Sequence, residues 1–423
     1  MRITNVKVEN FKSYKKMDIK LNDLNYIIGG NASGKSNFVN IFKFINDIVE
    51  YGLDDAILLQ GGIKYLFNSS SRKNGSLVLD IEFTMDDERS RIASIYPIEK
   101  IISLPNKLNY YLKINPNERG EGYKISKEKL VINFLKFQKN EDMLKEIEEF
   151  SLRINRDSNN KISDDYKENK DDNNELISLK QILRFIEKDG LLINNFFSSF
   201  GILYRYNNKI KIYNFDVNSL KSPSSIVARS ELEEDGSNLV NIIQQLLKSK
   251  SNKEKLNKIL KTILPFIDDI KVENNVNKSL FFKVKESYNK KEFPSYMLSD
   301  GTVNILAVIV ALYFQNSDNI IVLEEPERNI HPKLLNILVS LLEDISTKKQ
   351  IFLTTHNPYI IKEANLNDVI LVSRNEKGIS KVSKPINDEN VKLFLENDLG
   401  IEDLFINGIL RWKKIIIFLL KGR

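Results

Sequence analysis

The sequence contains no cysteine among its 423 residues. This absence excludes disulfide bonds, thiolate metal sites and cysteine nucleophiles, and it is compatible with a reducing compartment. Long apolar runs are missing as well, since the strongly apolar stretch at residues 415–420 is far too short to span a bilayer. The N-terminal stretch MRITNVKVENFKSY lacks the apolar core of a signal peptide. We therefore expect a soluble, cytoplasmic protein without a membrane partner.

A strong charge of one sign is also absent. Lysine and arginine number 63 against 57 acidic residues, which gives a net charge of +6. So mild an excess permits contact with nucleic acid but does not indicate it, because a surface that binds a phosphate backbone depends on local charge. Hydrophobic residues make up 42% of the chain, which is enough for a sizeable core.

Hydrophobic spacing predicts an α/β fold with a long insertion. A strand at residues 3–9, a buried strand at 25–28 and a helix at 36–49 open the chain. After residue 300, helices alternate with short apolar strands, which is typical of a mainly parallel sheet covered by helices. The predicted parts of the chain are residues 1–90, 91–230, 231–375 and 376–423.

The insertion is predicted to combine strands with helices. Strands expected at 76–84, 108–114 and 129–136 indicate a second, antiparallel sheet. Residues 155–174 are almost wholly polar and predict a mobile loop. Helices expected on either side of this loop would form a projecting arm, and they are predicted at residues 140–154 and 176–188.

A lysine-rich stretch follows the insertion. Six lysines fall between Lys248 and Lys261, on two predicted helices at 238–249 and 252–264. We interpret them as a solvated helix face rather than as a contact with nucleic acid.

The most specific motif is GGNASGKS, which fits G-x-x-x-x-G-K-S between an apolar strand and a helix. Its glycines allow backbone N–H groups to surround a phosphate, and the helix N-terminus adds a favourable dipole. Lys35 is expected to reach the β- and γ-phosphates of ATP, and Ser36 is expected to hold Mg²⁺. The residues expected to bind the nucleotide here are Gly29, Gly30, Asn31, Ala32, Ser33, Gly34, Lys35 and Ser36.

A second motif, IIVLEEPE at residues 320–327, ends a predicted central strand with two adjacent glutamates. Sheets of α/β proteins bind their ligands at this C-terminal end of the strands. One carboxylate would hold Mg²⁺, and the next would act as general base towards the attacking water. Neighbouring carboxylates are costly unless they share a cation, which favours a functional role for Glu324 and Glu325.

Two weaker motifs accompany these. LSDGT opens a helix, where Ser299 and Gly301 would form an anion site, although the pentapeptide is also ordinary capping sequence. FLTTHNP places His356 after another apolar strand, and beside the expected γ-phosphate pocket we favour a sensor role over a structural one. The other histidine, His331, stands before a proline and is expected to cap a helix.

In this order the four motifs resemble the ABC-type ATPase heads of the SMC, RecF and OLD families. KVENFKSY is similar to their opening strand, and GGNASGKS followed by Asn37 is similar to their phosphate-binding loop. LSDGT resembles their signature motif, EEPERNIHP their Walker B motif and D-loop, and TTHNP their switch histidine. The resemblance covers roughly residues 1–90 and 230–375.

The resemblance implies a P-loop NTPase head of the ABC type, with an antiparallel β lobe and a helical insertion. Two copies would pack head to tail with ATP and Mg²⁺ between them, so that the P-loop of one copy faces the signature motif of the other. By this comparison Glu325 is the catalytic base, His356 contacts the γ-phosphate, and Glu324 joins Ser36 at the magnesium position. The signature residues expected at the nucleotide are Ser299, Asp300 and Gly301.

The sequence also departs from these families. The magnesium position is Glu where many ABC proteins have Asp, as in the OLD-like branch, and Gln60 lies in a loop too uncertain to be assigned as the Q-loop glutamine. The stretch between Lys35 and Leu298 is longer than in transporter subunits and too short for SMC arms. The residues after 375 leave no room for the nuclease domain of many OLD proteins, and RWKKIIIFLLKGR is interpreted as a final strand rather than a docking segment.

The leading functional hypothesis is an ATP-controlled dimer that acts on DNA, or on a separate nuclease or toxin chain, in genome maintenance or antiphage defence. An alternative is an ATP-dependent assembly scaffold for a toxin or nuclease, with little turnover. A transporter subunit is disfavoured, because LSDGT replaces the transporters' usual LSGGQ and the insertion is long.

Overall fold

The computed structural model consists of two compact units, each drawn from separated stretches of the chain. Unit 1 comprises Met1–Asn22, Asn31–Lys209 and Val372–Ser383, and unit 2 comprises Asp23–Gly30, Ile210–Leu371 and Lys384–Arg423. The structure describes residues 1–69, 75–85, 101–117, 122–140, 143–167, 190–197, 209–226, 231–274, 279–288, 291–315, 318–389, 391, 393 and 400–406.

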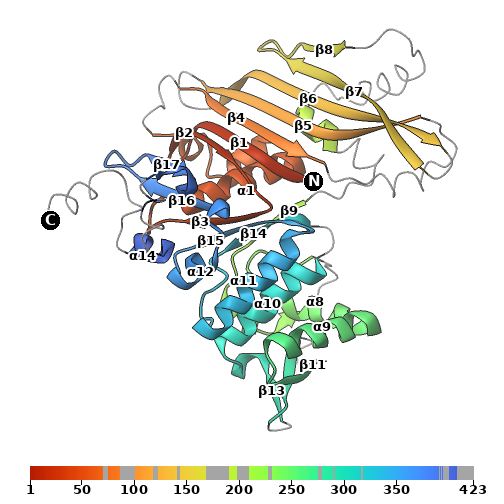
Figure 1. Cartoon of the computed structure of the whole chain (residues 1–423), viewed down its shortest axis with the longest axis vertical. Coiled ribbons are helices and arrows are strands. Elements are labelled where there is room, and N and C mark those ends of the chain that lie inside the picture. Colours follow the sequence, from red (N-terminus) through yellow and green to blue (C-terminus); the bar gives the residue numbers. More distant parts are fainter. Residues whose placement is uncertain are drawn as a thin grey trace. The chain divides into compact units, whose positions relative to one another are not determined.

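Unit 1 is built on a broad antiparallel sheet (Figure 1). The last strand in the order, β17, runs parallel to its neighbour β2, which brings residues near the end of the chain beside its first hairpin. The order across the sheet is β8 (Ile162–Lys167), β7 (Met143–Arg156), β6 (Tyr123–Asn140), β5 (Ile101–Pro116), β4 (Leu77–Thr84), β1 (Arg2–Phe11), β2 (Tyr14–Lys20) and β17 (Ser380–Ser383).

Strand alternation gives this sheet one buried face. In β4 every second residue, from Leu77 to Phe83, is buried. Helix α1 (Lys35–Tyr51) packs there, with the rings of Phe44 and of Phe11 on β1 only 5.8 Å apart. The short helices α2 (Leu53–Leu59) and α3 (Ile63–Leu66) follow it.

The predicted helical arm is wrong in the part that the structure describes. The expected helix at 140–154 is strand β7, and the first part of the expected mobile loop forms a turn and strand β8. The Glu-rich start of β7 favours a helix locally, but the long strand β6 offers a full row of hydrogen-bonding partners. The burial of Phe150, Leu152 and Ile154 follows strand spacing. Residues 168–189, which include the second expected helix, lie outside the described residues.

A buried polar cluster attaches residues 190–192 to this sheet. Glu128 is fully buried, and its Oε1 accepts hydrogen bonds from the hydroxyl of Tyr110 at 2.8 Å and from the backbone N–H of Leu192 at 2.7 Å. The Nε of Arg156 lies 3.2 Å from the other carboxylate oxygen, and this guanidinium also donates to the carbonyl of Gly190. The hydrogen bonds to Oε1 and the charge of Arg156 offset part of the cost of burying this carboxylate.

Unit 2 contains the parallel sheet that the sequence predicts. Its strands follow the order β16 (Val369–Arg374), β3 (Leu24–Ile28), β15 (Gln350–Thr355), β14 (Asp318–Glu324) and β9 (Lys209–Tyr213). The pairs β16–β3, β3–β15 and β15–β14 are parallel. Every residue of β3 and β15 is buried, as expected for strands of a parallel sheet that is covered on both faces.

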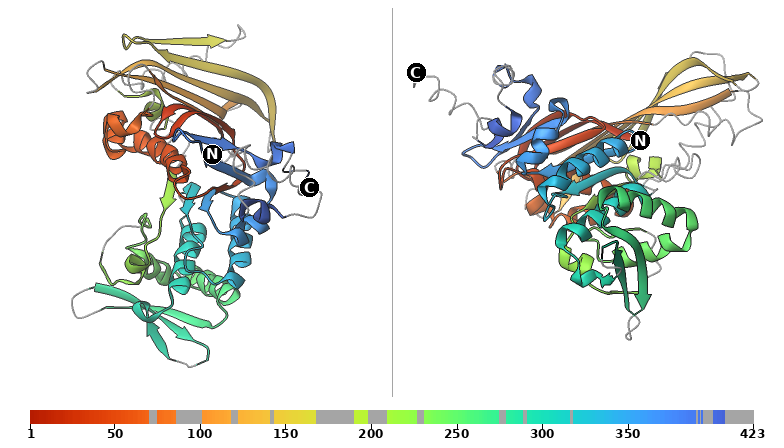
Figure 2. Two further views of the ribbon diagram at one scale, coloured as in Figure 1. Left: turned by 90° about the vertical axis from the view of Figure 1, so that its left-hand side faces the viewer. Right: turned by 60° about the horizontal axis from the view of Figure 1, so that its bottom comes forward.

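Helices and a small sheet complete unit 2 around one apolar core. In Figures 1 and 2, α8 and α9 lie beside β11 and β12, and α11 lies along α10. The helices are α7 (Val217–Lys221), α8 (Leu239–Lys248), α9 (Lys250–Ile263), α10 (Asp300–Phe314), α11 (Pro332–Ser346), α12 (Pro358–Glu363) and α14 (Ile401–Ile406), with short 3₁₀ turns η1 (Ser295–Met297), η2 (Leu366–Asp368) and η3 (Pro385–Asn387). The second sheet contains β10 (Ser224–Ser225), β11 (Ile267–Asn274), β12 (Ser279–Glu286) and β13 (Glu292–Pro294).

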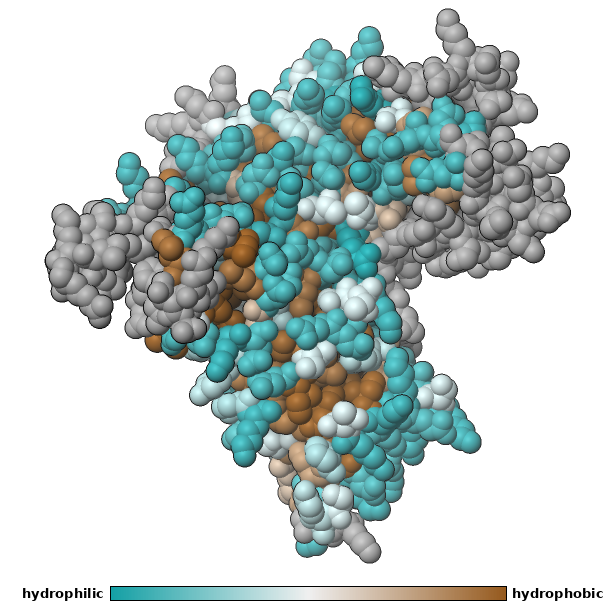
Figure 3. Space-filling model, viewed as in Figure 1, coloured by the Kyte–Doolittle hydropathy of each residue, from teal (hydrophilic) through white to brown (hydrophobic). Residues whose placement is uncertain are grey.

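The surface of unit 2 agrees with the interpretation of the lysine-rich stretch. Three of its six lysines contact neighbouring elements: Lys253 and Lys261 pair with acids at the start of β11, and Lys255 donates to the carbonyl of Tyr313. Hydrophilic residues cover most of the face in Figure 3, and a hydrophobic area lies over α10 and α11. Across the described part of the chain, no helix has the length and apolar character needed to cross a bilayer.

Candidate phosphate site and acidic edge

The phosphate loop, residues 29–36, joins β3 to α1 and requires two unusual backbone conformations. Ala32 has φ +58° and Gly34, which caps α1, has φ +116°. A Cβ atom on Gly34 would also collide with the side chain of Ser380 on β17. Glycine is therefore required at this position both for its conformational freedom and for the close approach of β17.

A chain of hydroxyl contacts holds the part of the loop that belongs to unit 1. The side-chain amide of Asn37 donates to the Oγ of Ser13 at 2.8 Å, and that oxygen lies 2.8 Å from the Oγ of Ser380. The hydroxyl of Ser380 in turn lies 2.7 Å from the carbonyl of Ser33. The phenol of Tyr14, kept protonated because burial raises its pKa, donates to the carbonyl of Gly34 at 2.9 Å.

The remaining loop groups are arranged for an anion. Arg374, the last residue of β16, donates to the carbonyl of Ala32 at 3.3 Å, and its guanidinium therefore lies beside the loop. Lys35 is buried, whereas Ser36 is exposed in the first turn of α1. The Oγ of Ser33 is buried and has no hydrogen-bonding partner among the residues that the structure describes. A buried hydroxyl and backbone N–H groups at a helix N-terminus fit a bound phosphate.

A cavity of about 460 Å³ opens in unit 1 beside these residues. Burial and the neighbouring Lys43 lower the pKa of one lining residue, Lys12. The wall includes Gln60, which the sequence left unassigned and which is buried at the end of α2. A polar, cationic cavity of this size suits an anionic small molecule. Its cationic lining residues are Lys12, Lys64, Arg374 and Lys377, and Ser13 and Asn37 connect it to the phosphate loop.

In unit 2, three parallel strands end together at one edge of the sheet. Ile28 of β3 pairs with Thr355 of β15, and Thr354 pairs with Glu324 of β14. The residues that follow these strands therefore emerge side by side. They are Gly29 and Gly30 at the start of the phosphate loop, His356 after β15, and Glu325 after β14.

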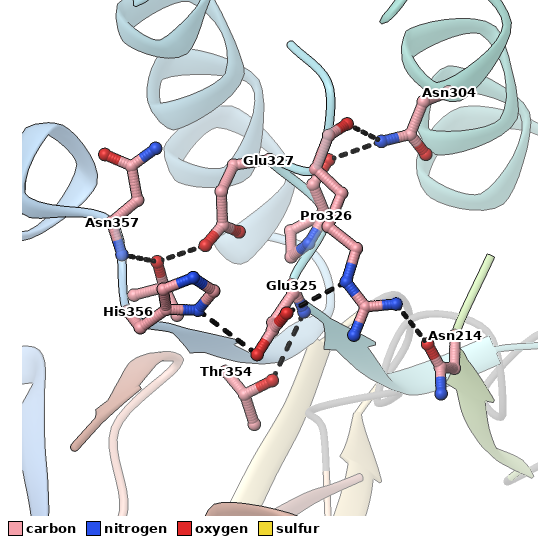
Figure 4. A network of polar contacts seen from close by, with 10 residues as sticks. Asn214, Asn304, Glu325, Pro326, Glu327, Thr354, His356 and Asn357 are labelled. Carbon is pink, nitrogen blue, oxygen red and sulfur yellow. Dashed lines mark hydrogen bonds and ion pairs between the residues drawn. The ribbon is translucent and has the colours of Figure 1, made fainter. Parts of the chain in front are cut away.

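Glu325 lies at the centre of a polar network at this edge (Figure 4). Its backbone has φ +45°, which is unusual for a residue with a side chain, and its N–H donates to the carbonyl of Thr354 at 3.0 Å. One carboxylate oxygen lies 3.2 Å from Nδ1 of His356, and the other accepts from Nε of Arg328 at 2.8 Å. Strain of this kind at a residue with a charged side chain is typical of a functional site.

A second glutamate, Glu327, was not singled out from the sequence. It is buried, and one of its oxygens accepts a hydrogen bond from the hydroxyl of Thr355, which itself accepts from the backbone N–H of Asn357. The other oxygen has no partner among the described residues. Burial raises the pKa of Glu327. This carboxyl group ties the segment after β14 to the turn that carries His356.

One signature residue, Gly301, packs against the segment after β14, which we call the D-loop segment (residues 326–330). Ser299 caps α10 by accepting from the backbone N–H of Thr302, and Asp300 forms an ion pair with Lys221. A Cβ atom on Gly301 would lie 2.6 Å from the carbonyl oxygen of Asn329. Gly301 is thus needed for packing within the chain, a role that the sequence did not indicate. His331 caps α11, as predicted.

The D-loop segment is also held from α10 by a buried asparagine. The side-chain amide of Asn304 donates to the carbonyls of Pro326 at 2.9 Å and Arg328 at 2.8 Å (Figure 4). Within the described ranges, no three His, Asp or Glu side chains gather as a metal site of their own.

A sequence profile for the AAA ATPase domain matches residues 1–361. The chain belongs to this ATPase family. The matched range includes the phosphate loop, the acidic edge and the start of α10.

Known proteins resemble this ATPase over parts of its length. The Septu protein PtuA of Bacillus mycoides is 28% identical over 149 residues, 33% of this chain and 20% of that protein. The chromosome partition protein Smc of Fusobacterium nucleatum is 32% identical over 126 residues, 29% of this chain and 10% of that protein. An uncharacterized protein of Methanocaldococcus jannaschii is 25% identical over 141 residues, 30% of this chain and 36% of that protein. The chain thus spans about a third or less of these relatives.

Among solved structures, the SMC head bound to the C-terminal winged-helix domain of ScpA has 17% sequence identity and a TM-score of 0.46, covering 90% of this chain and 97% of that chain. The SMC head of Thermotoga maritima has 13% identity and a TM-score of 0.44, covering 91% of this chain and 99% of that chain.

Proposed function

We propose that the protein binds ATP at residues 29–37 and hydrolyses it with Glu325 as general base. The observation that carries this proposal is the common edge of β3, β15 and β14, where the start of the phosphate loop, His356 and Glu325 emerge from adjacent parallel strands. Catalysis of phosphoryl transfer needs a phosphate cradle and a group that orients water, and this edge supplies both from one sheet.

In the proposed reaction, backbone N–H groups of the phosphate loop and the ammonium of Lys35 hold the phosphates. The carboxylate of Glu325 accepts a proton from the attacking water, which forms a bond to the γ-phosphorus as the bond to ADP breaks. The contact between Nδ1 of His356 and Glu325 leaves the opposite ring nitrogen, Nε2, to contact the γ-phosphate.

Mg²⁺ fits the oxygen donors available here. The hydroxyl of Ser36 and the carboxylate of Glu324 are ligands that this ion accepts, and they would hold it together with phosphate oxygens and water. When bound, the ion neutralises charge that develops on the phosphates.

We further propose that two copies close over ATP, with Ser299, Asp300 and Gly301 of one copy facing the phosphate loop of the other. All three are at least partly exposed at the start of α10, as such a role requires. The dimer would act on DNA, or on a separate nuclease or toxin chain, in genome maintenance or antiphage defence. The local similarity to a protein named for chromosome partition supports the DNA branch.

The test of the ATPase is phosphate release by the purified full chain with ATP and Mg²⁺. Glu325→Gln is expected to lower kcat by about a hundredfold or more while ATP binding persists, because it removes only the base. Lys35→Ala is expected to abolish binding of a fluorescent ATP analogue. Glu363→Gln changes an exposed glutamate of α12 in the same way and should leave both readouts unchanged. Turnover that survives Glu325→Gln would refute the assigned base.

A further inference from the structure

We infer that Arg328 restrains the carboxylate of Glu325, and that ATP hydrolysis requires this ion pair to open. The inference rests on the proposed role of Glu325 as general base. Arg328 is not among the residues that the sequence motifs predict to bind ATP or Mg²⁺. The inference is that Arg328 lowers the rate of ATP hydrolysis.

The carboxylate of Glu325 has a nitrogen partner at each oxygen. Oε1 lies 3.2 Å from Nδ1 of His356, and Oε2 lies 2.8 Å from Nε of Arg328. A general base must present a carboxylate oxygen to the attacking water. If His356 keeps its contact in order to orient its ring, the water must compete with Arg328 for Oε2.

The contacts of Arg328 restrain the carboxylate of Glu325, but they are weak enough to break. The arginine side chain is about half exposed, 49%, and Nη1 lies 3.4 Å from the amide oxygen of Asn214, on the loop before α7. Exposed ion pairs contribute little free energy, because water screens them. Little free energy is therefore needed to open the ion pair, and a small movement of the backbone is enough to separate the two side chains.

The backbone of Arg328 is connected to the signature helix. Asn304 of α10 donates to the carbonyl of Arg328 at 2.8 Å, and Gly301 packs directly against the carbonyl of Asn329. A shift of the first turn of α10 would move the D-loop segment and with it Arg328. In the proposed dimer this turn meets the ATP of the second copy, so closure of the dimer would free Glu325.

The experiment measures steady-state ATP hydrolysis by the full chain at low protein concentration, for wild type, Arg328→Ala and Arg328→Lys. Arg328→Ala is expected to raise kcat about two- to fivefold with little change in KM, the range expected for losing one exposed ion pair. Arg328→Lys keeps the charge but cannot bridge Glu325 and Asn214, and its rate should lie between the two. Lys333→Ala removes a nearby exposed cation and should not change kcat.

A double variant decides whether the effect runs through Glu325. In a Glu325→Gln background, Arg328→Ala should no longer raise the rate. A lower or unchanged kcat for Arg328→Ala in an otherwise active, Glu325-dependent enzyme would overturn the inference alone. A lower kcat would make Arg328 an electrostatic contributor to the reaction. A wild type whose turnover does not depend on Glu325 would instead refute the proposed function.

One readout does not depend on activity. The chain has two histidines, so His331 and His356 give two sets of ring signals in an NMR spectrum. Arg328→Ala should move the signals of His356, whose partner Glu325 loses its second contact, and leave those of His331 in place. Unchanged His356 signals would show that the contact does not restrain Glu325 in solution.

Discussion

At the scale of single residues, Gly34 determines the shape of the phosphate loop. Its positive φ and its closeness to Ser380 make any side chain unfavourable. Gly34→Ala is therefore expected to weaken binding of a fluorescent ATP analogue by about tenfold or more. Gly52 is a matched control, because it also has a positive φ, +88°, but has open space around its missing Cβ.

Gly52→Ala should cost about 1 kcal/mol of stability and leave the affinity for the analogue within about twofold of wild type. Equal losses of affinity in the two variants would contradict the role assigned to the contact with Ser380. Titrations followed by fluorescence anisotropy, with thermal unfolding of each variant, separate binding from stability.

The residues of the phosphate loop and the glutamates at the end of β14 could be predicted from the sequence, because the features that identify them are local. GGNASGKS contains its own turn and helix start, and LEEPE shows its carboxylates at a strand end. Ser380 and Glu327 gave no such signal. Ser380 acts through a partner far away in the chain, and Glu327 differs from its neighbour Glu325 only in burial, which spacing does not reveal.

At the scale of elements, Glu327 links the end of β14 to the turn after β15. Burial raises its pKa above the value in the unfolded chain, so the folded state binds its proton more tightly. The stability that this proton contributes is complete below the unfolded pKa and is lost as the pH rises through the folded pKa.

Replacing Glu327 by Gln, which stays neutral, isolates this effect. We expect wild type to lose stability relative to Glu327→Gln as the pH rises above about 4.5, the ordinary pKa of a glutamate, measured by chemical denaturation. Glu363→Gln, at an exposed position, should show no such change with pH. The difference in free energy of unfolding between wild type and Glu327→Gln is the quantity to follow. If it stays constant, or if wild type becomes relatively more stable as the pH rises, Glu327 does not bind its proton more tightly in the folded state.

Most elements of unit 2 could be predicted because parallel strands are buried on both faces and appear as apolar runs between helices. Strands β7 and β8 of unit 1 could not be predicted in this way. The sequence MLKEIEEF has helix-favouring residues, yet it lies opposite residues of β6 as an antiparallel strand. Its conformation depends on that partner, and single-sequence spacing carries no information about which strand will lie alongside.

At the scale of the whole molecule, the proposed site is complete only in a dimer. With ATP and Mg²⁺, Glu325→Gln is expected to elute with twice the 49.0 kDa mass of the chain, because closed dimers accumulate when hydrolysis stops. Light scattering after size-exclusion chromatography measures this. Adding Ser299→Arg should restore the monomer, since a bulky side chain would block the start of α10.

Ser249→Arg provides the control for this variant. Ser249 caps α9 as Ser299 caps α10, so both substitutions remove a helix cap and add the same side chain. Only the change at Ser299 is expected to affect the mass in the presence of ATP. A monomer under all conditions, or equal effects of the two substitutions, would argue against the head-to-tail dimer.

The contact between Ser380 and the phosphate loop also has a consequence for synthesis of the protein. The hydroxyl of Ser380 and the carbonyl of Ser33 are separated by 347 residues along the chain. Contacts between residues so far apart form late in folding, because other contacts must first offset the conformational entropy that is lost when the loop closes. A ribosome that has made the phosphate loop, the acidic edge and the signature helix has still not made the serine that supports the loop. Nascent or prematurely ended chains would therefore bind nucleotide poorly, and ATP binding would report that synthesis has passed β17.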